Sequence, residues 1–516
     1  MALKKDIYRA LQNIVGPDNV SDEPAILDSY AWRSGLIAGL EKFVPRFEAV
    51  TLPENTAEVQ AIVKLCNKSG IKFKASSTGW GIYCDPSGPG VVKLDLRRMN
   101  RIIEINEKSM YAVVEPFVIY AQLQAELMKR GLNCNITGAG SNCSALPLAA
   151  HSNLGHLSVS GSYGERNQLA LEWVTPDGEI VRTGTLGASD EWFCGDGPGP
   201  SLRGIVRGNT MPLGGLGVYT KAAQKVYHWS GPSVFPIEGV SPQYRPSYLP
   251  PGFMIRYFSF KSHELLREAV HRVGEAEVAF ILMGFNPGMM SANIATNNTE
   301  DIEYLKQYTD MVQGPGFMII IAGHSPRDFE YKKTALEMII KETDGKSLEP
   351  VEDPKNAGGF LYRFIRVTGS IRETCRATGT FGGEVGGTDV FNLMSKYIGE
   401  ASKVKDHYIK EDALLADGTD SFVQLIEHGH CGHGEMLIRY FPRNPASVEA
   451  NFEIYMAANR MAVKGHYGVP HHVWSDAIHD MYGPETSNYT KWHRKIKKTF
   501  DPNGASEANH YITAEK

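Results

Sequence analysis

The 516-residue sequence lacks the paired cysteines of a disulfide-stabilised or zinc-binding protein. Its seven cysteines are scattered, their number is odd, and no two of them form a Cys-x-x-Cys pair. The scattered, odd set of cysteines therefore argues against a disulfide framework and a zinc ribbon. The cysteine pattern therefore indicates a protein of a reducing compartment.

The sequence also has no excess of basic residues. It contains 53 Lys and Arg and 58 Asp and Glu, which gives a formal net charge of -5. This balance argues against nucleic acid or an anionic membrane as the main partner. The longest strongly apolar run, residues 317–322, is far too short to span a membrane. Residues 1–15 mix apolar and charged residues, which favours an amphipathic helix over a signal peptide. We expect a soluble, cytoplasmic protein.

The composition, 42% hydrophobic and 22% charged, is typical of a globular protein with a sizeable core. Strand and helix patterns alternate over residues 45–130, where Asn55 stands three residues before Glu58, the spacing of a capping box. A Pro- and aromatic-rich stretch, residues 230–251, has no periodicity and is interpreted as a linker. The pattern predicts an α+β fold on each side of it.

Beyond the linker, helices are predicted at about 262–276, 326–343 and 445–464, and strands at 278–283, 317–322, 422–427 and 436–441. Ser325 followed by Pro326 is typical of a helix start. The alternation of Phe360, Tyr362 and Phe364 predicts one face of a strand.

Two segments have the composition of a nucleotide-binding site. Residues 76–81 form a loop of small residues after a predicted strand, and such a loop lets backbone N–H groups approach a diphosphate. Residues 138–156 offer the further donors Ser141, Asn142, Ser144, His151 and His156. An ordinary turn and a self-packed loop remain open alternatives. A Walker lysine and a Rossmann glycine motif are absent, which argues against ATP and NAD.

Residues 428–435 bring three histidines, one cysteine and one glutamate together. If the preceding strand continues, His428 and His430 share a face and, with Glu435, suit a divalent metal such as zinc or iron. The alternative is a pocket without metal, in which His430 or His433 serves as substrate donor or proton acceptor.

Six segments, in this order along the chain, resemble the vanillyl-alcohol oxidase/p-cresol methylhydroxylase family of flavoproteins. They are Ser76-Ser77-Thr78-Gly79-Trp80-Gly81, Val113-Val114-Glu115-Pro116, Gly161-Ser162-Tyr163-Gly164-Glu165, Pro176-Asp177-Gly178-Glu179, Gly214-Gly215-Leu216-Gly217-Val218-Tyr219-Thr220 and Phe500-Asp501-Pro502-Asn503-Gly504. The resemblance implies a two-domain α+β protein with a PCMH-type FAD-binding domain and an α+β cap. The expected boundaries are 1–225 for the FAD-binding domain, 226–464 for the cap, and 465–516 for a C-terminal return to the FAD-binding domain.

The resemblance also implies site residues. The family's carboxylate close to flavin N5 falls on Glu165, and its C-terminal Tyr-Arg pair falls on Pro470 and His471. Trp80 stands where the family's phenol oxidases have a tyrosine, so the phenolate clamp of those enzymes is missing. Catalytic roles are expected for Glu165, His430, His433 and His471. Cofactor contacts are expected at Ser76, Ser77, Thr78, Gly79, Trp80, Gly81, Ser141, Asn142, Gly161, Gly217 and Val218.

By the same resemblance, a covalent flavin link needs a His or Tyr of the cap or a loop His. Residues 380–384 of the cap offer neither, so FAD is expected to be bound non-covalently, with Cys143 and His151 left open as attachment points. A divalent metal also remains open, because the His-rich motif of the related D-lactate and glycolate dehydrogenases has two His seven apart. Here Glu435 occupies the second of these positions.

The expected function is hydride transfer from a substrate C–H, of an aromatic or benzylic alcohol or an alkylphenol-type carbon, to flavin N5. The alternatives are a metal-assisted 2-hydroxy-acid dehydrogenase and a flavin-free scaffold with a degenerate fold. The expected partners are a small-molecule substrate and an electron-acceptor protein or quinone, with a homo-oligomer left open. Oxidase and dehydrogenase are not distinguished.

Overall fold

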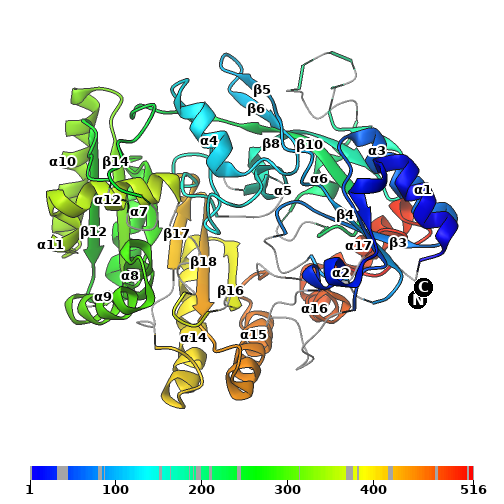
Figure 1. Ribbon diagram of the computed structural model, residues 1–516. Helices are drawn as coiled ribbons and strands as arrows, with labels where there is room; N and C mark the ends of the chain where they lie inside the picture. Colours follow the sequence, from blue (N-terminus) through cyan, green and yellow to red (C-terminus); the bar gives the residue numbers. More distant parts are fainter. Residues whose placement is uncertain are drawn as a thin grey trace.

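The computed structural model describes residues 3–31, 45–79, 84–86, 88–149, 154–162, 164–184, 186, 188, 189, 191, 192, 199–208, 212–240, 244, 246–312, 314–367, 376–379, 383–416, 422–470, 473, 475–507 and 511–514. Helices and strands are mixed along this part of the chain. In Figure 1 the N-terminal elements and the C-terminal helices α16 and α17 lie together on one side, β12 to α12 lie on the other, and β17 and β18 lie between them.

The first sheet has the order β1-β2-β4-β3, with β1 antiparallel and the other three strands parallel. Its strands are β1 (Val20–Ser21), β2 (Ala49–Thr51), β4 (Val91–Asp95) and β3 (Lys72–Ser76). The crossover from β2 to β3 is α3 (Thr56–Ser69), which begins where Asn55 accepts the Glu58 N–H and ends at Gly70 in the left-handed conformation. The preceding elements are α1 (Lys5–Val15), η1 (Pro17–Asn19) and α2 (Pro24–Ser29).

The second sheet is antiparallel and has the order β5-β6-β10-β8-β9. Its strands are β5 (Ile102–Asn106), β6 (Tyr111–Val114), β10 (Val218–Lys225), β8 (Gln168–Val174) and β9 (Ile180–Arg182). One face packs against α4 (Tyr120–Met128) and α5 (Ala145–Leu148) in a common apolar core. The short elements η2 (Gly164–Asn167) and α6 (Arg203–Val206) lie in its connections, and β7 (Leu132–Asn133) pairs with β11 (Tyr227–His228).

Beyond residue 252, a third sheet has the order β13-β14-β12-β15. Its strands are β13 (Ile281–Gly284), β14 (Gly316–Ala322), β12 (Phe253–Ser259) and β15 (Lys346–Ser347). Every residue of β14 is buried, as expected for a central strand covered on both faces. The accompanying helices are α7 (His263–Glu275), α8 (Pro287–Ile294), α9 (Asn298–Met311), α10 (Pro326–Glu342), α11 (Glu349–Glu352) and α12 (Pro354–Arg366).

A fourth sheet, β16-β18-β17, is called the cap sheet below and consists of β16 (Gly383–Asp389), β18 (Cys431–Ile438) and β17 (Phe422–Ile426). Helix α14 (Phe391–Lys410) packs on one face of it, and α15 (Pro445–Gly465) follows. A Cβ atom at Gly432 or Gly434 would lie 2.6 Å from Phe391 or Ile398 of α14, respectively. Glycine at these two positions therefore lets the helix lie directly on the sheet.

The C-terminal segment returns to the first sheet. After α16 (Ser475–Tyr482), η4 (Pro484–Thr486) and α17 (Tyr489–Phe500), the Phe73 N–H donates to Ala505 O at 2.9 Å. Next to this contact, the Lys74 ammonium and the Glu507 carboxylate form a buried ion pair with a distance of 3.0 Å. Residues more than 400 positions apart are thereby joined in one unit.

Most of the helices and strands that the sequence predicts are confirmed, including α7, α10 and α15, and Ser325 accepts the Asp328 N–H as the N-cap of α10. One prediction is wrong. Phe360, Tyr362 and Phe364 lie in the helix α12, where Phe360, Leu361, Phe364 and Ile365 are buried at helical spacing. The strand predicted at 436–441 is present with other bounds, Cys431–Ile438. Among the described residues, no helix is long and apolar enough to cross a membrane.

The tail depends on one buried ammonium group. Lys497 is 2% exposed, and its Nζ donates to Gly215 O at 2.6 Å, Asp501 Oδ2 at 2.5 Å and Ser506 O at 2.8 Å. Burial lowers the pKa of Lys497, and the Asp501 carboxylate acts in the opposite direction. All three ammonium hydrogens are thus used to hold α17 and the tail against the loop before β10.

We predict that Lys497→Met destabilises the protein by about 3 kcal/mol, because it leaves the buried Asp501 carboxylate without its cation. Thermal and urea unfolding measure the effect. The matched control is Lys498→Met at the neighbouring exposed position, which is expected to change the stability by less than about 0.5 kcal/mol. Equal effects of the two substitutions would contradict the prediction.

Candidate functional site

The first candidate cofactor element is the loop after β3. Ser76 ends the strand, and Gly79 has φ +68°, a conformation that favours glycine. The Ser144 hydroxyl, at the N-terminus of α5, donates to Ser77 Oγ at 2.6 Å and accepts the Thr78 N–H at 3.4 Å. Hydroxyl and N–H groups of two distant segments therefore meet here, an arrangement that suits phosphate oxygens.

The second candidate element is the loop that carries Ser141 and Asn142. The Ser141 N–H donates to Val367 O at 3.2 Å, and its carbonyl accepts the Ala121 N–H at 2.8 Å. Asn142 is exposed. Val367 directly follows α12, so the second half of the chain holds this loop through its backbone.

Three further predicted cofactor positions lie in closely packed places. A Cβ atom at Gly161 would lie 2.8 Å from the Tyr227 ring. Gly217 has φ +90°, and a Cβ atom there would lie 2.2 Å from a β8 carbonyl. Val218 starts β10 and is 2% exposed in the core. Packing accounts for these residues, and their contact with a cofactor remains a prediction.

Buried polar atoms without partners indicate that FAD fits this region. His156 is fully buried, its Nδ1 accepts the Ile136 N–H at 3.0 Å, and its Nε2 has no hydrogen-bond partner. Burial lowers the pKa of His156 to about 4, so the ring is neutral at pH 7. Gln168 and Gln224 also have unpartnered amide atoms. Such atoms are rare in folded proteins, and a polar cofactor supplies partners for them.

The cap sheet has one polar face. Gln424 of β17, His433 of β18 and Thr388 of β16 are direct cross-strand neighbours and lie on the same face. Cys431 and Glu435 flank His433 at spacing two, so they share this face. The opposite face packs against α14. We call these five residues the polar row.

His433 is the centre of the polar row and is 1% exposed. Its Nε2 lies 3.3 Å from Glu435 Oε2, and its Nδ1 lies 3.0 Å from Thr388 Oγ1. With Glu435 ionised and the imidazole neutral, Nε2 donates to the carboxylate and Nδ1 accepts the threonine hydroxyl. The imidazole is held from both sides, and the Glu435 side chain is 13% exposed.

Three hydrogen bonds join the cap sheet to the segment 155–159 of the N-terminal half. Gln424 Nε2 donates to Gly155 O at 3.3 Å. The main-chain N–H of Glu427 donates to Ser158 O at 2.8 Å, and that of His428 to Val159 O at 2.9 Å. Because Gln424 belongs to the polar row, this row faces the N-terminal half of the chain.

The predicted catalytic Glu165 lies at this junction. It is 9% exposed on η2, and its carbonyl accepts from Arg207 Nη1 at 3.0 Å. Burial, with added contributions from the Glu427 and Glu165 carboxylates, raises the pKa of the Cys431 thiol to about 11. Arg166, which follows Glu165, forms an ion pair with Glu427. Glu165 is therefore close enough to the start of β18 to act on it electrostatically.

The predicted metal set is not assembled. In the described part of the chain, no three His, Cys, Asp or Glu side chains are placed to hold a metal ion. The strand β17 ends at Ile426, and a 3-10 turn, η3 (Glu427–Gly429), replaces the expected strand continuation. His428 has φ +55° in this turn and His430 is exposed, while Glu435 is bonded to His433. The expectation that His428 and His430 share a strand face is wrong, because the chain turns between them.

Several predicted residues lie outside the described residues: Trp80, Gly81, His151, His471 and the segment 380–382.

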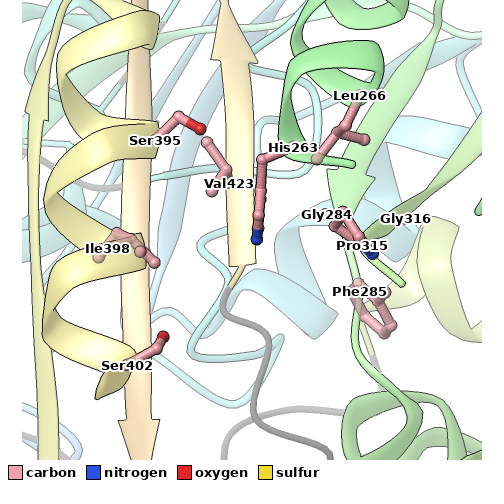
Figure 2. Close-up of a pocket in the computed structure, with 11 residues that line it drawn as sticks. His263, Leu266, Gly284, Phe285, Pro315, Gly316, Ser395, Ile398, Ser402 and Val423 are labelled. Atoms are coloured by element: carbon pink, nitrogen blue, oxygen red, sulfur yellow. The ribbon is translucent and has the colours of Figure 1, made fainter. Parts of the chain in front are cut away.

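A small cavity lies behind the cap sheet and not at the polar row. Its lining includes His263, Ser395, Ser402 and Val423, between α7, α14 and β17 (Figure 2). Val423 alternates with Gln424 and so points to the opposite face. The volume of about 10 Å³ is room for about one water molecule. This cavity is too small for a substrate.

Sequence reasoning missed Thr388 and Gln424 as members of the site. The signal for Gln424 was present, because a lone amide in the apolar run of β17 is unusual in a buried strand. Thr388 had no such signal, since only the pairing of β16 with β18 brings it to His433.

Comparison with known proteins assigns a domain. The FAD binding domain family matches residues 47–184. The 1'-carboxy-chondrochloren decarboxylase of Chondromyces crocatus is 34% identical over 31% of this chain and 31% of its own length. The 4-cresol dehydrogenase [hydroxylating] flavoprotein subunit of Pseudomonas putida is 30% identical over 38% of each chain. The matched part thus spans about a third of the length of these relatives.

Two solved structures cover nearly the whole chain. That of p-cresol methylhydroxylase has a TM-score of 0.75 at 18% identity and covers 98% of this chain and 96% of its own. That of 4-ethylphenol oxidase from Gulosibacter chungangensis has a TM-score of 0.73 at 20% identity and covers 99% and 97%. The resemblance inferred from the six sequence segments is confirmed. The chain contains an FAD-binding domain and has the two-domain α+β fold of the p-cresol methylhydroxylase-type flavoproteins.

Proposed function

We propose that this protein is an FAD-dependent oxidoreductase that removes a hydride from a carbon atom of a small organic substrate. The substrate class is an aromatic or benzylic alcohol or an alkylphenol. The observation that carries the proposal is the polar row, a buried His433 held between Thr388 and Glu435 on a cap-sheet face that is hydrogen-bonded to the N-terminal half of the chain. The Glu165 carboxylate supports the proposal because it contributes to the raised pKa of Cys431 at the start of β18.

The proposed domain division follows the contacts of the chain. Residues 1–225 and 465–516 form the FAD-binding domain, and residues 226–464 form the cap. In support, the tail pairs with β3 and inserts Lys497 beside Gly215. The third sheet and the cap sheet consist only of strands between residues 253 and 438.

The residues of the polar row handle the substrate proton in this proposal. Bound FAD supplies the acceptor for the hydride. Oxidation of an alcohol also releases the hydroxyl proton, and the partly accessible Glu435 carboxylate accepts it. His433 orients this carboxylate through its Nε2–H, and Thr388 keeps the imidazole in the required tautomer. The products are the carbonyl compound, a proton held by Glu435 and a hydride transferred to the acceptor.

In this proposal Glu165 forms the wall opposite the polar row and is the second titratable group of the site. Its place next to Arg166, which pairs with Glu427, couples it to the junction of the two halves. His430 is exposed on the turn and is suited to contact with an entering substrate. His471 keeps its proposed catalytic role from the sequence.

A metal-assisted 2-hydroxy-acid dehydrogenase is less well supported, because Glu435 is already bonded to His433 and no metal cluster exists among the described side chains. For the electrons, we propose transfer to an acceptor protein or a quinone. The similar protein of Pseudomonas putida is a flavoprotein subunit.

We predict that the purified protein has the visible spectrum of oxidised flavin and that acid precipitation releases the colour into the supernatant. Non-covalent FAD is expected because the cap segment 380–384 has no residue suited to attachment. Colour that stays in the pellet would contradict this and indicate a covalent link. A colourless protein that FAD cannot reconstitute would rule out the oxidoreductase and favour a scaffold.

We further predict that His433→Ala slows the reduction of bound FAD by 4-hydroxybenzyl alcohol about a hundredfold, because the proton acceptor Glu435 loses its support. Stopped-flow absorbance of the flavin measures the rate, and reduction by dithionite checks that FAD is still bound. The matched control is His407→Ala, an exposed histidine of α14 that pairs with Glu411 away from the polar row. An unchanged rate in the His433 variant would remove this residue from the mechanism.

A further inference from the structure

Two buried glutamines face each other on β8 and β10 without satisfying their amides. Gln168 is 1% exposed, and neither its Nε2 nor its Oε1 has a hydrogen-bond partner. Gln224 is 2% exposed, and its Nε2 has no partner. The two residues are direct partners in the β8–β10 register. Two donors and one acceptor are therefore buried side by side, although buried polar atoms are almost always paired.

The sheet register shows which face carries these amides. Gln224 pairs with Ala112 of β6 and lies two residues from Ala222, so all three share a face. An extra residue in β8, Leu169, shifts the register so that Gln168 joins the same face. Without this bulge, the two amides would not be neighbours.

This face of the sheet lies on the side of the two candidate cofactor elements, the loop after β3 and the loop that carries Ser141 and Asn142. Ala112 and Ala222 belong to the same core cluster as Cys143, Ala145 and Leu146, and α5 packs on β10 (Figure 1). Ser144, which starts α5, is the residue that reaches the loop after β3. The unpaired amides are thus buried at the centre of the FAD-binding domain, on the side of the cofactor loops.

We propose that Gln168 and Gln224 bind the imide edge of the isoalloxazine ring of FAD. This edge offers two carbonyl acceptors on either side of one N–H donor. Two amide donors and one amide acceptor complement it in number and kind. The edge of adenine, the other heterocycle of FAD, offers a donor beside an acceptor and matches only two of the three atoms. The proposal requires FAD binding but does not depend on the substrate or the reaction proposed above.

The test uses Gln168→Met and Gln224→Met, which keep the side-chain length and remove the amide. If the amides serve the cofactor, the apoprotein loses only unsatisfied groups, and its unfolding temperature stays the same or rises. FAD affinity falls about tenfold for Gln168→Met, which corresponds to about 1.4 kcal/mol. Flavin fluorescence on titration with FAD measures the affinity, and differential scanning fluorimetry measures the unfolding temperature.

The matched control is Gln124→Met. Gln124 is also fully buried, but its Nε2 donates to Asn133 Oδ1 and Ile365 O, both at 2.8 Å, and its Oε1 accepts from Arg366. A structural glutamine of this kind is expected to lower the unfolding temperature when it is replaced and to leave the FAD affinity unchanged. The two kinds of position therefore respond in opposite ways.

A second readout uses the holoprotein and needs no stable apoprotein. Donors to the imide carbonyls stabilise the electron-rich reduced ring, so loss of these donors moves the midpoint potential of bound FAD to a more negative value. Xanthine-oxidase-coupled reduction with a reference dye measures this potential. The visible absorption band of the oxidised flavin is also expected to shift.

The outcomes separate the assignments. Weaker FAD binding together with a more negative potential supports the imide edge. Weaker binding at an unchanged potential overturns it in favour of the adenine. Variants that lose stability as Gln124→Met does, while FAD affinity and potential stay unchanged, overturn any cofactor role. None of these readouts uses a substrate, so failure of the proposed reaction leaves the test intact.

Discussion

The arrangement of the site depends on how closely α14 packs on the cap sheet. Gly432 and Gly434 leave no room for side chains between strand and helix, so β18 carries its large polar residues only on the other face. The alternation of the strand then brings Cys431, His433 and Glu435 into one line. Main-chain hydrogen bonds from the turn after β17 to the segment 155–159 hold this line against the FAD-binding domain.

Local chemistry made much of the fold predictable. The Asn55 and Ser325 caps are side-chain contacts within one turn, so their signals lie within a few residues of sequence. The resemblance that gave the fold came from six short segments rich in glycine and small residues, and such residues let backbone segments approach closely. Gly217 is an example, because any side chain there would collide with the β8 backbone.

The site was less predictable, because its members meet only through pairing of distant strands. His433 needs β16 for its contact with Thr388, and the metal hypothesis depended on whether β17 continued beyond Ile426. A turn with positive φ at Glu427 and His428 ends it, and glutamate is not a residue type that marks such a turn in sequence. In α12 the alternating aromatic residues predicted a strand. The buried residues of this segment recur at helical spacing, and their burial favours the helix.

The FAD-binding half of the chain holds two kinds of buried polar group. Lys497, Gln124 and the Lys74–Glu507 pair are buried and fully bonded, as expected where polar groups hold elements together. Gln168, Gln224 and His156 are equally buried, but each has at least one side-chain nitrogen without a partner, and Gln168 and His156 lie within the FAD-binding match. An unsatisfied buried group costs about 1–3 kcal/mol. Retaining several in one region destabilises the free protein, and a bound ligand that supplies their partners recovers this free energy as affinity.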